Sequence, residues 1–192
     1  MNKPLTKVAV ARRQLATAID LFFADRDSVS VYSLAANAWE VIDALCRKAE
    51  LQSFSVQVRE NVPKGEDLKR NYINSPHRNF FKHADNDSEQ TLASLLDSQV
   101  EGVLFLAVED YIRLNQRSPI QLQVFQVWYL AKYPGKLDPI VACRIVEGID
   151  RTFPGLALLS RREQLALGAR MLLQAAGDEG LCGDPRTESA FE

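Results

Sequence analysis

Both histidines of the chain, His77 and His83, lie in one short segment that is also rich in basic and aromatic side chains. The basic residues between positions 64 and 83 are Lys64, Lys69, Arg70, Arg78 and Lys82, against only two acidic residues. Histidine titrates near neutral pH and can transfer protons, and arginine offers a planar fork of donors that matches a phosphate. We therefore expect an anionic ligand, and any acid–base chemistry, in this segment.

Within it, Arg78, Asn79 and His83 form an arginine, a polar residue and a histidine, with four residues between the arginine and the histidine. This pattern resembles the signature of the HEPN superfamily, helical-bundle proteins that are often dimeric RNases. The resemblance implies metal-independent RNA cleavage at a homodimer interface, without a cofactor. His83 would move the proton of a ribose 2′-hydroxyl, Arg78 would neutralise the charge of the transition state, and Asn79 would orient the site.

Three further side chains, Arg70, His77 and Lys82, are predicted to contact the RNA. Arg70 and His77 also match a looser form of the same pattern, with six residues between them. We prefer the pairing of Arg78 with His83, because Ser75-Pro76 favours the start of a helix and would interrupt the other span.

A second resemblance covers residues 79–85, Asn-Phe-Phe-Lys-His-Ala-Asp, together with residues 34–42. This combination is similar to a family of small bacterial proteins that brings no established activity with it. The resemblance implies a bacterial origin.

Two other interpretations of the same residues stay open. Arg78 and His83 would pair with Glu40, Asp85 or Asp87 to tie two helices together, in which case the chain is a non-catalytic protein–protein interaction module. Alternatively, His83 and the two aspartates would supply donors for a metal ion, although three ligands from one short segment rarely suffice.

The composition is that of an ordinary globular protein. The chain has 192 residues, of which 46% are apolar and 25% charged, and its net charge is −2. No run approaches the roughly 20 apolar residues that cross a membrane, so we expect a cytoplasmic protein without a membrane partner. The near-neutral charge and the lack of a complete DNA-binding motif argue against DNA as a ligand.

Apolar periodicity predicts an all-α bundle of six to seven helices with at most one short strand. The expected helices cover residues 5–24, about 28–46, 88–114, 120–133, 138–152 and 160–177, and the alternating residues 51–58 are the candidate strand. Ser160 and Glu163 form a capping box at the start of the last helix. We expect one helical domain over residues 1–177 and a disordered, glycine-rich tail over residues 178–192.

Overall fold

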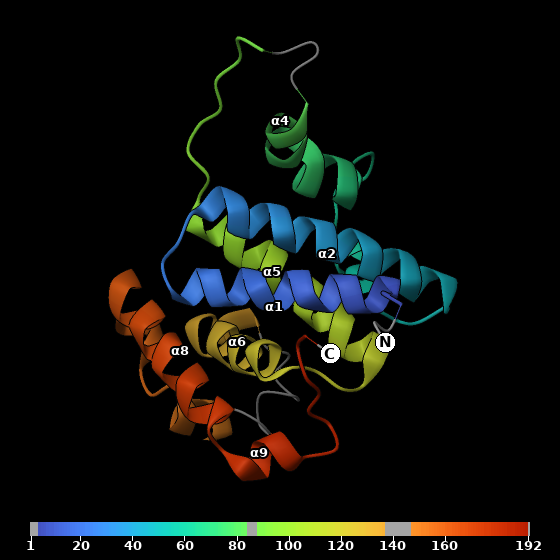
Figure 1. Cartoon of the computed structure of the whole chain (residues 1–192). Coiled ribbons are helices and arrows are strands. Elements are labelled where there is room, and N and C mark those ends of the chain that lie inside the picture. Colours follow the sequence, from blue (N-terminus) through green and yellow to red (C-terminus); the bar gives the residue numbers. More distant parts are fainter. Residues whose placement is uncertain (1–3, 84–87, 137–146, 192) are drawn as a thin grey trace.

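The computed structural model describes residues 4–83, 88–136 and 147–191. Its N-terminal hairpin consists of α1 (Lys7–Phe23) and α2 (Ser28–Lys48). The predicted cap Asp27 accepts a hydrogen bond from the Ser30 backbone N–H at 2.8 Å. The two helices lie side by side (Figure 1), as their short connection predicts. The remaining elements are α3 (Phe54–Glu60), η1 (Leu68–Arg78), α4 (Asn79–Lys82), α5 (Asp97–Asn115), α6 (Ile120–Lys132), α8 (Arg161–Ala176) and α9 (Glu179–Gly183), with 3₁₀ turns η2 (Pro134–Lys136) and η3 (Leu156–Leu158).

These elements confirm the predicted all-α, single-domain class. Among the described residues there is no β-sheet, only one isolated bridge between Ser118 and Thr187. Helices α6 and α8 cover one side of the α1–α2–α5 group, whereas η1 and α4 lie on the other side, beyond α2 (Figure 1). Most of the helix predicted for residues 138–152 lies outside the described residues, but 147–152 are helical.

The predicted strand at residues 51–58 is instead the start of helix α3. Ser53 Oγ caps the helix by accepting from the Val56 backbone N–H at 3.3 Å. The buried Asp110 carboxylate accepts from both the backbone N–H, at 2.9 Å, and the hydroxyl of Ser55. A helix start stabilised by a carboxylate from a distant part of the chain overrides the alternating pattern.

Helix α5 begins at Asp97, later in the chain than Ser88, where the apolar pattern predicts its start. Residues 88–96 are not helical, and Leu96, which the pattern places inside the helix, is the residue before its first turn. The Gln99 side chain accepts from the Leu96 backbone N–H at 2.9 Å and so satisfies one of the unpaired donors there. Leu96 is exposed rather than buried.

The segment after Gly177, predicted to be disordered, is ordered over residues 178–191. It forms α9 and then returns along the bundle, so that the chain termini lie near one another (Figure 1). Glu188 accepts hydrogen bonds from Arg12, at 2.7 Å, and from the Tyr111 hydroxyl, at 2.6 Å. These distant polar partners, which a local composition argument does not take into account, fix the segment.

The core contains both tryptophans, in agreement with their position beside apolar helical faces. Trp39 is 1% exposed and donates from Nε1 to Ser55 Oγ, whereas Trp128 is fully buried and donates to the Gln164 carbonyl. Phe22 and Phe23 of α1 make edge-on contacts with Trp128. In the part of the chain that the structure describes, no helix is long and apolar enough to cross a membrane.

Candidate functional site

Arg78, the predicted catalytic arginine, is buried against helix α2. One guanidinium nitrogen forms an ion pair with Glu40, and the others donate to Asn37 Oδ1, the closer at 2.7 Å. Asn74 of η1 accepts a further hydrogen bond at 3.2 Å. With 8% of its surface exposed and its donors directed at protein groups, Arg78 acts as a structural link between α2 and η1.

Glu40 completes this corner by binding a second cation. Lys69, from the first turn of η1, forms an ion pair with the same carboxylate. Burial opposes ionisation of Glu40, but the hydrogen bonds and charges of Lys69 and Arg78 outweigh it, so the pKa of Glu40 is lowered. We call Asn37, Glu40, Lys69 and Arg78 the Glu40 corner. It contains the pairing of Arg78 with Glu40 that the structural interpretation foresees, whereas the other two expected partners, Asp85 and Asp87, lie outside the described residues.

Four other residues of the predicted RNA site lie at the surface. Asn79, Lys82 and Arg70 are exposed, and so is His83, which follows the last residue of α4. The His83 backbone N–H donates to the Asn79 carbonyl at 3.0 Å. The structure therefore exposes these side chains while it directs the guanidinium of Arg78 inward.

His77, the sixth residue of the predicted site, is buried. It is 5% exposed, and its ring makes an edge-on contact with Tyr32 at 5.5 Å between centroids. Neither ring nitrogen makes a hydrogen bond of ordinary geometry among the described residues, although the Gln99 side chain lies close enough to the ring to raise its pKa as a hydrogen-bond partner. Burial lowers the pKa of His77, and Gln99 opposes this to a smaller extent.

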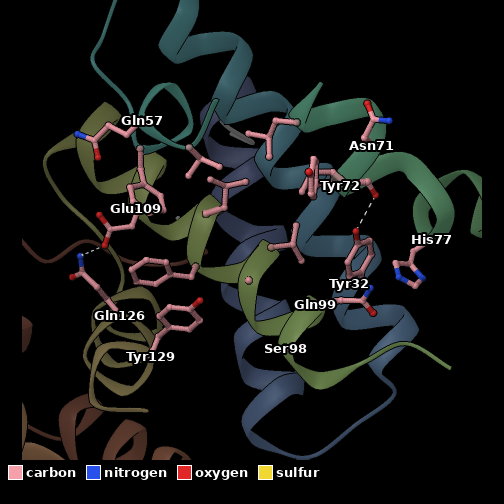
Figure 2. A pocket seen from close by; sticks show the side chains of 18 of the residues that line it. Tyr32, Gln57, Asn71, Tyr72, His77, Ser98, Gln99, Glu109, Gln126 and Tyr129 are labelled. Atoms are coloured by element: carbon pink, nitrogen blue, oxygen red, sulfur yellow. Dashed lines mark hydrogen bonds between the residues drawn. The ribbon is translucent and has the colours of Figure 1, made fainter. Parts of the chain in front are cut away.

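The His77 ring lies in the wall of a cavity of about 990 Å³ between η1, α3, α5 and α6 (Figure 2). Its lining includes apolar side chains, among them Phe54, Leu68, Val103 and Leu106. The volume is at the upper end of the range typical of small-molecule sites, which is roughly 300–1,000 Å³. Neither Arg78 nor His83 lines this cavity.

Two groups of polar side chains lie at separate ends of the cavity. Tyr32, Gln99 and His77 lie together at one end, whereas Glu109 and Gln126 lie at the other (Figure 2). Residues 99 and 109 both belong to α5, and ten residues of helix span about 15 Å. The Tyr32 hydroxyl donates to the Ile73 carbonyl at 2.9 Å, which fixes the ring at the first end.

At the second end, Glu109 accepts a hydrogen bond from Gln126 at 2.6 Å and forms a longer ion pair with Arg113 at 3.6 Å. Burial raises the pKa of Glu109, and the Gln126 hydrogen bond and the Arg113 charge offset only part of this effect. The Arg113 guanidinium also lies over the Phe54 ring at 5.3 Å.

Sequence reasoning did not find the α5 side of this cavity. Gln99, Gly102 and Glu109 follow no motif, and their common cavity depends on how η1 and α3 pack beside α5. One signal was available, since Glu109 and Asp110 follow a run of apolar residues on a helix expected to be buried. Within the described residues no group of three potential metal ligands occurs, and Asp85 and Asp87 of the metal interpretation lie outside them.

Comparisons with family models, with curated proteins and with solved structures found no match to this chain. The geometry of the Glu40 corner and of the cavity is therefore the basis for a functional proposal.

Proposed function

We propose that this chain is a non-catalytic binding protein that holds a ligand in the cavity between η1, α3, α5 and α6. The observation that carries this proposal is the buried His77, whose ring nitrogens make no hydrogen bond of ordinary geometry among the described residues, although Gln99 lies close to the ring. A buried polar group without a hydrogen bond costs about 1–3 kcal/mol, and a bound ligand that supplies the partner removes that cost.

The separation of the titratable groups supports binding rather than catalysis. General acid–base catalysis requires its groups within hydrogen-bond reach of the same reacting atoms. His77 and Glu109 lie at opposite ends of the cavity (Figure 2), on the order of 15 Å apart along α5. Among the described lining residues no cysteine or lysine is available as a nucleophile.

The Glu40 corner supports a structural role for the HEPN-like pattern. An arginine that neutralises a phosphate transition state must present its donors to the substrate. The Arg78 donors are directed at Glu40, Asn37 and Asn74 instead. RNA cleavage through Arg78, Asn79 and His83 stays a prediction, and it requires Arg78 to leave Glu40.

One experiment separates the two functions. Purified wild type, Arg78→Ala and His83→Ala are incubated with mixed structured and unstructured RNAs in the presence of EDTA, and their thermal unfolding is measured in parallel. We expect no cleavage, a clear loss of thermal stability in Arg78→Ala and an unchanged melting temperature in His83→Ala. Cleavage by wild type that both variants lose would overturn the non-catalytic proposal.

The homodimer implied by the HEPN resemblance is tested in the same preparation by sedimentation velocity. The chain has a mass of 21.6 kDa, so a dimer sediments as a species of twice that mass. A monomer over the whole concentration range would contradict the dimer and would remove the second Arg78–His83 pair that a HEPN-type site needs.

A further inference from the structure

We infer that the cavity receives an uncharged, elongated organic molecule with an apolar, planar body and one hydrogen-bonding group at each end. This inference rests on the proposed binding function and goes further by naming the chemical class of the ligand. The charges of the lining, its aromatic side chains and its two polar ends each determine one property of this ligand.

The charges of the lining select against an anion. Among the described lining residues, only Glu109 and Arg113 carry a formal charge; they pair with each other at 3.6 Å, and Arg113 Nη1 has no hydrogen-bond partner. Burial lowers the pKa of His77, which disfavours a positive charge on this side chain. The cations of the Glu40 corner do not line the cavity and are already bound to Glu40. A phosphate or carboxylate would therefore lose its hydration and gain at most the Arg113 Nη1 donor, which lies beside the Glu109 carboxylate that already pairs with Arg113.

The aromatic side chains of the lining favour a flat, apolar body. Phe105 and Tyr129 stack face to face, with 4.0 Å between centroids and 12° between planes, and both rings line the cavity. Phe54 lies edge-on to Phe105 at 5.5 Å. Such a wall offers contact area and ring faces but few hydrogen bonds. An extended peptide would bury backbone amides here without partners, so a small organic molecule fits better than a peptide.

The two polar ends of the cavity require hydrogen-bonding groups on the ligand that are on the order of 15 Å apart, the length of ten residues of α5. At one end, a hydroxyl or amide of the ligand completes the hydrogen bonding of His77. At the other end, Glu109 and Gln126 form a donor–acceptor pair that a second polar group can join. A neutral imidazole has one donor nitrogen and one acceptor nitrogen, so a ligand hydroxyl can accept a hydrogen bond from the first or donate one to the second.

Gly102 gives a way to close the cavity without disturbing the fold. It lies on α5 in the cavity wall, and a Cβ atom added there meets no atom within 4 Å. Gly102→Leu therefore places a side chain in open space and also improves helix propensity. Gly148→Leu is the matched control, because Gly148 is also helical, also has open space around its Cβ and does not line the cavity.

Three stilbenes of the same shape serve as probes: 4,4′-dihydroxystilbene, stilbene-4,4′-dicarboxylate and unsubstituted stilbene. Binding of each to wild type, Gly102→Leu, Gly148→Leu and His77→Phe is measured by isothermal titration calorimetry, with amide NMR spectra to locate the site. We expect the diol to bind wild type at least about tenfold more tightly than the dicarboxylate or stilbene. We expect Gly102→Leu to abolish diol binding, His77→Phe to weaken it about tenfold and Gly148→Leu to leave it unchanged.

The outcomes separate the ligand class from the binding function. Equal or tighter binding of the dicarboxylate, or binding of the diol that Gly102→Leu does not change, would overturn the inferred class. If no stilbene binds, the inferred class is overturned too, and the same NMR spectra are used to screen a library of charged and uncharged fragments. A fragment whose binding Gly102→Leu blocks would leave the binding function standing, whereas no such fragment would overturn that function too.

Discussion

His77 and Arg78 are consecutive residues at the end of η1, yet their polar atoms have opposite surroundings. Both are largely buried, with 5% and 8% of their surfaces exposed. The Arg78 guanidinium has three protein side chains as partners, whereas neither nitrogen of His77 makes a hydrogen bond of ordinary geometry among the described residues, although Gln99 lies close to the ring. Burial alone therefore does not distinguish a polar group that links two helices from one that lacks ordinary hydrogen bonds, but the hydrogen-bond partners do.

The largest expected effect on stability concerns Arg78, the residue of this pair that has hydrogen-bond partners. Arg78→Ala removes a buried partner of Glu40, and breaking a buried ion pair costs about 3–5 kcal/mol. Because Glu40 keeps Lys69 and is partly exposed, we expect a loss of about 2–3 kcal/mol in the free energy of unfolding. Urea titration measures the loss, and Lys82→Ala, an exposed cation on the next turn, is the control. A loss equal to that of the control would end the structural interpretation of the corner.

For His77, substitution is expected to raise rather than lower the free energy of unfolding. His77→Phe keeps a ring against Tyr32 and Phe81 and removes two buried nitrogens without partners. We expect the free energy of unfolding of the ligand-free protein to rise by about 1 kcal/mol. The same urea titration measures the change. A decrease would show that His77 makes a favourable polar interaction in the free protein, and the contrast with Arg78 would disappear.

The pH dependence of stability sharpens the same contrast. The pKa of His77 is lowered from its ordinary value of 6.5, so below pH 6.5 the unfolded chain binds more protons than the folded protein. The titration of His77 therefore leaves stability unchanged above pH 6.5 and lowers the free energy of unfolding as pH falls from 6.5 through the folded-state pKa.

We therefore expect the difference in unfolding free energy between wild type and His77→Phe to grow as pH falls from 7.5 to 5.5. The slope stays below about 1.4 kcal/mol per pH unit, the limit for one proton. Urea titrations at several pH values measure this difference, and His83→Ala is the control because His83 is exposed. A difference that does not change with pH would contradict the lowered pKa.

The smallest effect is expected at the other histidine. His83→Ala removes an exposed side chain at the end of α4, and surface substitutions usually change stability by less than about 0.5 kcal/mol. Thermal unfolding measures the shift. A larger loss would indicate that His83 has a structural partner and that it belongs with Arg78 in the comparison.

The sequence allowed those parts of the fold to be predicted that depend on local patterns. The Asp27 cap, the capping box of Ser160 and Glu163 and the apolar faces of the long helices are short-range features. The start of α3 was not predictable in this way, because its decisive partner, Asp110, is 55 residues away in the sequence. The order of residues 178–191 likewise depends on Arg12 and Tyr111 of distant helices.

For the site, the sequence indicated the segment but not the roles within it. Charge and aromatic content identified residues 64–83, and Glu40 was named as one partner of Arg78. The burial of His77 depends on the kink of η1, where Ser75 has extended backbone angles, and on packing against α2. No spacing rule connects His77 to Gln99 or Glu109, so the cavity became visible only in the tertiary structure.

The returning C-terminal segment affects where the smallest autonomously folding unit ends. Glu188 is held by Arg12, Tyr111 and Asn115, and Ala190 is buried, 7% exposed, beyond it. Proteolytic trimming after Gly177 would remove this acceptor from three donors at once and uncover apolar surface of the bundle. The minimal folding unit therefore extends at least to Ala190, and a fusion partner attached close behind that residue needs a linker that leaves this segment in place.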